Sequence, residues 1–235
     1  MTKEWKAKAD AAFVIVDVQN DFCPGGSLAV ADGDKIVPVI NELKKHFSTC
    51  VLTQDWHPHG HTSFASAHPG KKEYELIQMP YGEQRLWPDH CEQNTHGAEL
   101  HKDLEAAPMD FILRKGNNPA VDSHSAVFEN DHVTEPRFAD GRTFTQMMKN
   151  HGIKTLVFSG LAFDYCVGMS ALDARKKGFE VYVVSDASKG IAPASIKDME
   201  QKLQAAGVKT VTSKHLSCFL ADAPACSKPS CCKPK

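Results

Sequence analysis

Asp17, Lys115 and Cys166 each follow or close a short apolar run, and together they offer a carboxylate, an ammonium group and a thiol. The three stretches are VIVDV, FILRK and TLVFSGLAFDYC. A thiol with an acid–base partner and a nearby cation is the set that nucleophilic catalysis by cysteine requires. The three residues therefore predict a cysteine nucleophile, provided that the fold brings their side chains together.

Taken singly, each residue also has a structural explanation. Asp17 is suited to capping a turn at the rim of a sheet, Lys115 to extending its ammonium group into water, and Cys166 to filling a small apolar space. Cys166 differs from the other cysteines because it opens a predicted helix, where the partial positive charge of the N-terminus favours a thiolate. Backbone N–H groups of that turn are also suited to hold an oxyanion.

A second group of candidates follows another apolar run, in the stretch TQDWHPHGHTSF. Asp55 and His57 are two residues apart, so their side chains leave the same face of an extended segment, and His59 and His61 continue the alternation. With His90 from LWPDHC, one carboxylate and two imidazoles would suit zinc, iron or manganese and leave positions open for substrate. A histidine-rich surface loop is the alternative that the spacing alone leaves open.

The elements that must position these residues are recurrent β-branched runs. Six runs predict strands, at residues 12–18, 50–55, 110–115, 155–160, 180–187 and 208–213. Most are apolar throughout, as in strands that helices cover on both faces. Helical patterns alternate with them, at residues 33–47, 142–152, 166–178 and 192–207. This order predicts an α/β fold, a three-layer α/β/α sandwich with a mostly parallel central sheet, in which ligands bind beyond the carboxyl ends of the strands.

Length and composition define the domain limits. The chain of 235 residues favours one domain, expected over residues 1–220. Segment 57–108 is too long for an ordinary connection, so we expect it to build the metal site and to cap the substrate. The Cys/Lys/Pro-rich tail 221–235 is expected to be disordered, and the scattered cysteines before it are expected to be free thiols.

The charge balance limits the classes of partner. Lys plus Arg number 27 and Asp plus Glu number 29, so no basic excess indicates nucleic acid or an anionic membrane. The start, MTKEWKAKAD, is charged and leads into a short apolar run, a pattern that predicts neither a signal peptide nor a spanning helix. We therefore expect a cytoplasmic protein that binds a small neutral or weakly charged molecule and forms a homo-oligomer.

Taken together, DVQNDF, TQDWHPHGHTSF, LWPDHC, RKG and GLAFDYCV resemble the nicotinamidase/pyrazinamidase branch of the isochorismatase-like cysteine hydrolases. The resemblance keeps the family's order from about Phe13 to about Phe219. It implies a catalytic triad of Asp17, Lys115 and Cys166 and a set of metal ligands formed by Asp55, His57 and His90. The implied cofactor is one divalent ion, with zinc expected first and iron or manganese as alternatives. The ligand set favours the amidase branch, because the isochorismatase branch lacks it.

The resemblance also implies the reaction. Nicotinamide would be hydrolysed to nicotinate and ammonia through a cysteine thioester, with a role in NAD salvage, and pyrazinamide would be accepted too. The metal would bind the pyridine nitrogen and orient the ring. The backbone amides of Ala162 and Cys166 are the implied oxyanion hole, beside a Leu161–Ala162 peptide bond that is cis in the family. The implied substrate-binding residues are Phe22, Trp87 and His124.

Two positions depart from the family pattern. Phe163 stands where threonine is usual, and His124 stands where tyrosine is frequent, so both could change the size or the ring contacts of the pocket. Two other functions stay open: an amidase of the same superfamily for another small amide or carbamoyl compound, and a catalytically silent binding protein. A thiol redox role is disfavoured because Cys166 has no CxxC partner. Whether His61 joins the metal is also open.

Overall fold

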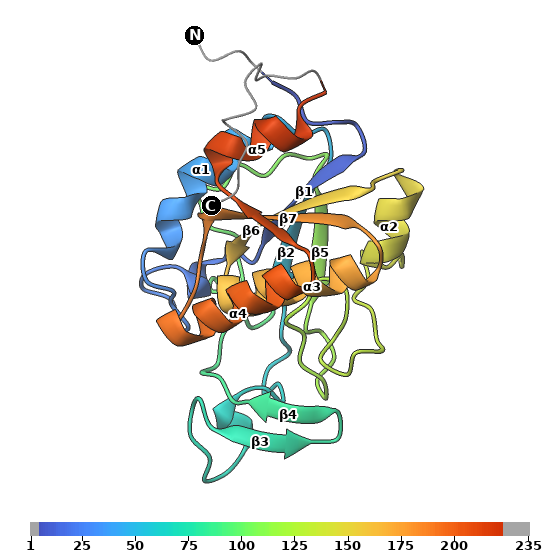
Figure 1. Ribbon diagram of the computed structural model, residues 1–235. Coiled ribbons are helices and arrows are strands. Elements are labelled where there is room, and N and C mark those ends of the chain that lie inside the picture. Colours follow the sequence, from blue (N-terminus) through green and yellow to red (C-terminus); the bar gives the residue numbers. More distant parts are fainter. Residues whose placement is uncertain (1–4, 223–235) are drawn as a thin grey trace.

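The computed structural model describes residues 5–222, and its centre is a six-stranded parallel sheet (Figure 1). The strands are β1 (Ala11–Val16), β2 (Cys50–Asp55), β5 (Phe111–Lys115), β6 (Thr155–Leu161), β7 (Glu180–Lys189) and β8 (Lys209–Val211). They lie in the order β5-β2-β1-β6-β7-β8, and every neighbouring pair is parallel. The predicted α/β fold with a mostly parallel sheet is confirmed.

Helices cover both faces of this sheet (Figure 1). They are α1 (Val37–Lys44), α2 (Phe144–Asn150), α3 (Gly168–Lys176), α4 (Pro193–Ala205) and α5 (Ser213–Leu220). One core contains Ile40 of α1 and Leu216 of α5, and the other contains apolar residues of α2, α3 and α4 such as Leu203. Phe13 and Val14 of β1 belong to different cores because successive strand residues face opposite sides. No helix within residues 5–222 is long and apolar enough to cross a membrane.

Local signals in the sequence set the limits of the helices. The Thr143 side chain accepts a hydrogen bond from the Gln146 N–H, and the Gln146 side chain accepts one from the Thr143 N–H, so α2 starts with a capping box. Gly152, Gly178 and Gly207 follow α2, α3 and α4 with φ values of 69°, 92° and 74°. These left-handed conformations end the helices where the sequence predicted.

Three features differ from the sequence-based expectation. Strand β1 ends two residues early because Asp17 has a φ of 48°. Segment 57–108 contains an antiparallel hairpin of β3 (Leu76–Met79) and β4 (Gly82–Arg85), which projects from the sheet layers in Figure 1. Helix α5 was not predicted either. The predicted tail lies outside the described residues except for Ala221, which pairs with Ala7 in an isolated antiparallel bridge, and Asp222, whose N–H donates to the Lys6 carbonyl at 3.2 Å.

The strand order places the chemistry at the centre of one rim. Strands β2 and β5 follow β1 toward one edge of the sheet, whereas β7 and β8 follow β6 toward the opposite edge, so the strand order reverses between β1 and β6. Such a reversal opens a crevice at the carboxyl ends of the two central strands. Asp17 directly follows β1, Asp55 and Lys115 close β2 and β5, and Cys166 lies in the turn after β6.

Candidate active site

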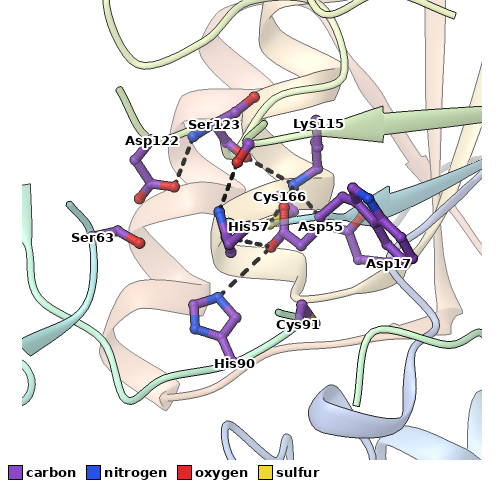
Figure 2. Close-up of polar contacts among 12 residues, drawn as sticks. Asp17, Asp55, His57, Ser63, His90, Cys91, Lys115, Asp122, Ser123 and Cys166 are labelled. Atoms are coloured by element: carbon purple, nitrogen blue, oxygen red, sulfur yellow. Dashed lines mark hydrogen bonds and ion pairs between the residues drawn. The ribbon is translucent and has the colours of Figure 1, made fainter. Parts of the chain in front are cut away.

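Lys115 is fully buried, and its ammonium group is the centre of an ionic cluster at this rim (Figure 2). Its Nζ lies 2.9 Å from Asp17 Oδ2 and 3.6 Å from Cys166 Sγ, and it donates hydrogen bonds to Asp55 Oδ1 and, at 2.9 Å, to the Ser123 carbonyl. Burial disfavours the charged form of Lys115, but Asp17 and Asp55 raise its pKa well above the usual value. Lys115 is therefore an ammonium ion in the folded protein.

The two carboxylate oxygens of Asp17 have different surroundings: Oδ1 is held by a hydrogen bond, and Oδ2 forms an ion pair with Lys115. Thr53 Oγ1 donates to Asp17 Oδ1 at 2.5 Å and accepts from the Asp17 N–H at 3.1 Å. Oδ2 is buried and, apart from its ion pair with Lys115, accepts no hydrogen bond from residues 5–222. Burial raises the pKa of Asp17, and Lys115 opposes this rise. A buried oxygen with unused acceptor capacity is suited to take the proton of a thiol.

Cys166 lies in a π-helical turn, Phe163–Val167, between β6 and α3, and it is 5% exposed. Its Sγ and one oxygen each of Asp17 and Asp55 lie within 4.8 Å of one another. Burial raises the pKa of the thiol well above its usual value; Lys115 opposes the rise and the two carboxylates add to it. The buried surroundings thus favour a thiol at rest, in contrast to the thiolate that the helix N-terminus alone led us to expect.

Asp55 also faces the two histidines of the predicted metal site. Its Oδ2 lies 3.8 Å from His57 Nε2 and 3.9 Å from His90 Nε2 (Figure 2). In each ring Nδ1 lies beside a backbone carbonyl, that of Gly116 at 3.1 Å for His57 and that of Pro88 at 2.7 Å for His90. Nδ1 therefore carries the proton in both rings, and the lone pair of Nε2 faces Asp55. This is how histidines that bind metals are commonly anchored, so the three side chains fit a divalent ion.

His61 uses its ring nitrogens in the opposite way. Its Nδ1 accepts the Ser63 N–H at 3.2 Å, and its Nε2 lies 2.9 Å from the Asn118 carbonyl, to which it must donate. With the proton on Nε2, the ring has a single in-plane lone pair, at Nδ1, and the Ser63 N–H already points to it. The ring stacks on His57 with 4.3 Å between centroids. His61 therefore supports His57 by packing, while His59 is exposed and pairs with Glu92 at 3.2 Å.

A pocket lies over the ionic cluster and the metal-ligand residues. Its walls include the predicted substrate-binding residues Phe22, Trp87 and His124, as well as Ala162 and Cys166. The remaining lining residues are Leu28, Asp55, His90, Asp122, Tyr165 and Ile191. The structure therefore brings Cys166, Asp55, His90 and the ring-binding candidates to a single cavity, while Asp17, Lys115 and His57 lie behind its lining.

The amino-acid sequence of this chain is similar to those of known proteins. Residues 11–215 match the family model described as the isochorismatase domain. The chain belongs to the isochorismatase family. It is 45% identical over 212 residues to the nicotinamidase of Acinetobacter baylyi, covering 90% of this chain and 96% of that one. The resemblance to the nicotinamidase/pyrazinamidase branch of the family is thus confirmed.

Solved structures show the same isochorismatase-family architecture. The nicotinamidase/pyrazinamidase of Acinetobacter baumanii has a TM-score of 0.84 and 47% identity, covering 90% of this chain and 100% of that chain. The pyrazinamidase of Pyrococcus horikoshii, solved in complex with zinc, has a TM-score of 0.69 and 33% identity, covering 86% and 99%. The Leu161–Ala162 peptide bond of the present chain is cis, as the family resemblance implied.

The two departures from the family pattern lie in different surroundings. Phe163 is buried in the core beneath α2, α3 and α4, and it is not a lining residue of the pocket. His124 does line the pocket, and its Nε2 lies 3.8 Å from Asp122 Oδ2. Its ring contacts Trp87 and Tyr165 edge-on, at 6.0 and 5.8 Å between centroids. Of the two positions, only His124 can contact a bound ring directly.

Several lining residues were missed by the sequence reasoning. Asp122 is 2% exposed and accepts a hydrogen bond from Gln84 Nε2 at 2.8 Å. Burial would raise the pKa of Asp122, but neighbouring histidines, His124 foremost, hold it well below its usual value. Tyr165 is the residue before Cys166, and Ile191 follows β7 by two positions. The strand-end rule that identified Asp17 could also have identified Ile191.

Proposed function

We propose that this protein is a nicotinamidase, which hydrolyses nicotinamide to nicotinate and ammonia. The observation that carries the proposal is the cluster around Lys115, which brings the Cys166 thiol and the Asp17 carboxylate together under a pocket lined by Asp55 and His90. The extensive similarity to nicotinamidases supports this choice of substrate.

The proposed reaction begins with proton transfer from Cys166 Sγ to Asp17 Oδ2. Lys115 is close to both atoms and stabilises the thiolate that forms. The thiolate attacks the carboxamide carbon, and we assign the resulting oxyanion to the backbone N–H groups of Ala162 and Cys166. Asp17 then returns the proton to the amide nitrogen, the C–N bond breaks, ammonia leaves and a thioester remains.

The second half of the reaction uses the same carboxylate. A water molecule attacks the thioester carbon while Asp17 accepts its proton. The C–S bond breaks as Asp17 gives this proton to the departing sulfur, which restores the Cys166 thiol. The nicotinic acid that forms loses its own proton to solvent and leaves as nicotinate. Lys115 remains charged throughout, because Asp17 and Asp55 raise its pKa despite its burial. Its role is electrostatic in both halves.

Asp55, His57 and His90 would hold one divalent ion, for which we favour zinc. When bound, such an ion supplies a Lewis acid that holds the pyridine nitrogen and so directs the carboxamide to Cys166. The chain itself supplies the walls for the ring. Phe22 is buried against His90, with 5.5 Å between centroids, and Trp87 is 4% exposed.

The proposal extends to a second substrate and to a cellular role. Pyrazinamide presents a ring nitrogen and a carboxamide in the same relative positions as nicotinamide, so it should bind the same groups. Conversion of nicotinamide to nicotinate would serve NAD salvage in the cytoplasm.

The test measures ammonia release by the purified protein with nicotinamide, before and after chelation and after zinc is added back. Benzamide is the matched control, because it has the same carboxamide on a ring without nitrogen. We expect release from nicotinamide to be lost on chelation and restored by zinc, and benzamide to react far more slowly. No release by folded, zinc-loaded protein would overturn the proposal. Equal rates for both amides would show that the ion does not orient the substrate through its ring nitrogen.

A further inference from the structure

Ile191 occupies a distinctive place in the pocket, because it is the only exposed residue among those that line it. The Ile191 residue is 41% exposed, whereas the other apolar wall residues Leu28 and Phe22 are 8% and 6% exposed. His124 and Tyr165 are half-buried. The mouth of the pocket, defined here as His124, Tyr165 and Ile191, therefore has one aliphatic side chain that faces both the ligand space and the solvent.

The backbone of Ile191 is fixed by the turn that carries the nucleophile. Asp164, two residues before Cys166, is 5% exposed and accepts the Ile191 N–H at 2.9 Å and the Ala192 N–H at 3.2 Å. It also accepts the Ser195 hydroxyl at 2.5 Å. Hydrogen bonds to a buried carboxylate are among the stronger ones in proteins. Asp164 thus links the turn that carries Cys166 to the backbone of Ile191.

Packing leaves little room for the segment before Ile191 to shift. A Cβ on Gly190 would lie 2.5 Å from Ile196 Cγ1 and 2.9 Å from Asp164 Oδ1, so this backbone is in close contact with α4 and with the nucleophile turn. Lys189 closes β7 beside Leu161, the last residue of β6. The position of the Ile191 side chain is therefore defined by its surroundings, although the side chain itself is exposed.

The proposed function indicates which atom of the substrate ring faces Ile191. If the ring nitrogen is held at the metal ligands and the 3-carboxamide at Cys166, both attachment points of the pyridine ring lie at the floor of the pocket. Ring atom C2 lies between them, and C5 is the atom directly opposite C2. A substituent on C5 must then point away from the floor and toward the mouth.

We propose that Ile191 is a specificity-determining residue that limits the size of the substituent on C5 of a pyridine-3-carboxamide, and that Asp164 is the positioning residue that holds it in place. This inference rests on the proposed nicotinamidase function. The mouth would discriminate pyridine-3-carboxamides by the size of the C5 substituent: nicotinamide and its small 5-substituted derivatives are accepted, and derivatives with a bulky 5-substituent are excluded.

The experiment compares kcat/KM for nicotinamide and for 5-phenylnicotinamide in zinc-loaded wild-type protein and in Ile191→Ala. Hydrophobic pockets discriminate about 10- to 200-fold per small group, so we expect the selectivity for nicotinamide over 5-phenylnicotinamide to fall at least about tenfold. Ile112→Ala is the matched control: Ile112 is 37% exposed on β5 and lies outside the pocket, so this variant should keep the wild-type selectivity.

Asp164→Asn tests the positioning residue, and it should lower the selectivity in the same direction without slowing the reaction of Cys166 with iodoacetamide. Ser195→Ala removes one donor to Asp164 and serves the same purpose if the asparagine variant does not fold. Unchanged selectivity in Ile191→Ala, with wild-type protein active on nicotinamide, would overturn this inference and leave the proposed function intact. Wild-type protein inactive on nicotinamide would overturn the proposed function and the substrate class named here with it.

Discussion

The floor and the mouth of the pocket are built by different parts of the chain and by different forces. The floor has Asp55 in its lining and Asp17 and Lys115 behind it; all three come from strand ends, are buried and are joined by charge. The mouth takes His124 and Ile191 from connections, where aromatic edges and aliphatic surface face the solvent. A parallel sheet thus delivers reactive groups to a desolvated rim, whereas selectivity is left to loops. Asp17, Asp55 and Lys115 cannot be replaced singly without leaving a buried charge unpaired, whereas Cys166 and the mouth residues can.

The largest effect is expected at the floor, for Cys166→Ala. Loss of a nucleophile that acts together with its base lowers kcat by at least about 10⁴-fold in comparable hydrolases. The variant should fold, because alanine fits the space of a buried thiol and removes no charge of the cluster. Ammonia release and thermal unfolding measure the two outcomes. Turnover retained in a sample free of wild-type protein would refute the mechanism.

Lys115→Met should give the largest loss of stability. It leaves Asp17 and Asp55 buried without their shared cation, and breaking a buried charge pair from one side costs about 3–5 kcal/mol in free energy of unfolding. Urea unfolding of the zinc-free protein measures this loss. Lys202→Met, which removes an exposed ion pair with Asp198, is the control and should have little effect.

The pH dependence of the Lys115→Met loss identifies its cause. Burial raises the pKa of Asp17 and Lys115 opposes that rise, so removal of the ammonium group raises this pKa further. The folded variant then binds a proton at a higher pH than the unfolded chain, where the carboxyl titrates near 3.8. Its stability deficit should shrink as the pH falls through the raised pKa and should be largest at neutral pH. A deficit that does not change with pH would indicate lost packing instead.

The next largest effect is expected on zinc affinity, and it is measured by comparing variants of His90 and His61. His90→Ala removes a proposed ligand and should weaken zinc binding by at least about 100-fold, more than the loss of a supporting group costs. His61→Gln should retain zinc within about tenfold, since both ring nitrogens of His61 already have partners in the protein. Titration with a competing chelator compares the affinities. Equal losses in the two variants would make His61 a ligand.

The floor was predictable from the sequence because its signal is local. Asp17, Lys115 and Cys166 each stand beside an apolar run, and the parallel order of the runs implies that their carboxyl ends share a rim. What the sequence could not supply is the degree of burial. The helix N-terminus suggested a thiolate at Cys166, but burial, together with Asp17 and Asp55, raises the pKa of this thiol against the opposing effect of Lys115.

The mouth and its supports were harder to predict because their signals are weak or distant. Strands β3 and β4 have four residues each, of which only Gln84 is buried, so they lack the apolar alternation that marks a strand. Asp122 accepts a hydrogen bond from Gln84, which is 38 residues away in the sequence, so no local pattern marks it as a pocket residue. Phe163 adjoins the catalytic motif but points into a core, and nothing in the sequence separates it from Tyr165, which lines the pocket.

The smallest effect is expected at the mouth, for His124. Its ring contacts Trp87 and Tyr165 edge-on, and aromatic contacts of this kind contribute about 0.5–1.5 kcal/mol. His124→Ala should therefore raise KM for nicotinamide about 2- to 12-fold while kcat changes less, since the ring contacts Trp87 and Tyr165 and makes no hydrogen bond or ion pair with Asp17 or Lys115. His124→Tyr restores an aromatic edge and should return KM toward the wild-type value. A loss of kcat as large as that of a floor variant would instead give His124 a part in the chemistry, and the division between floor and mouth would fail at this residue.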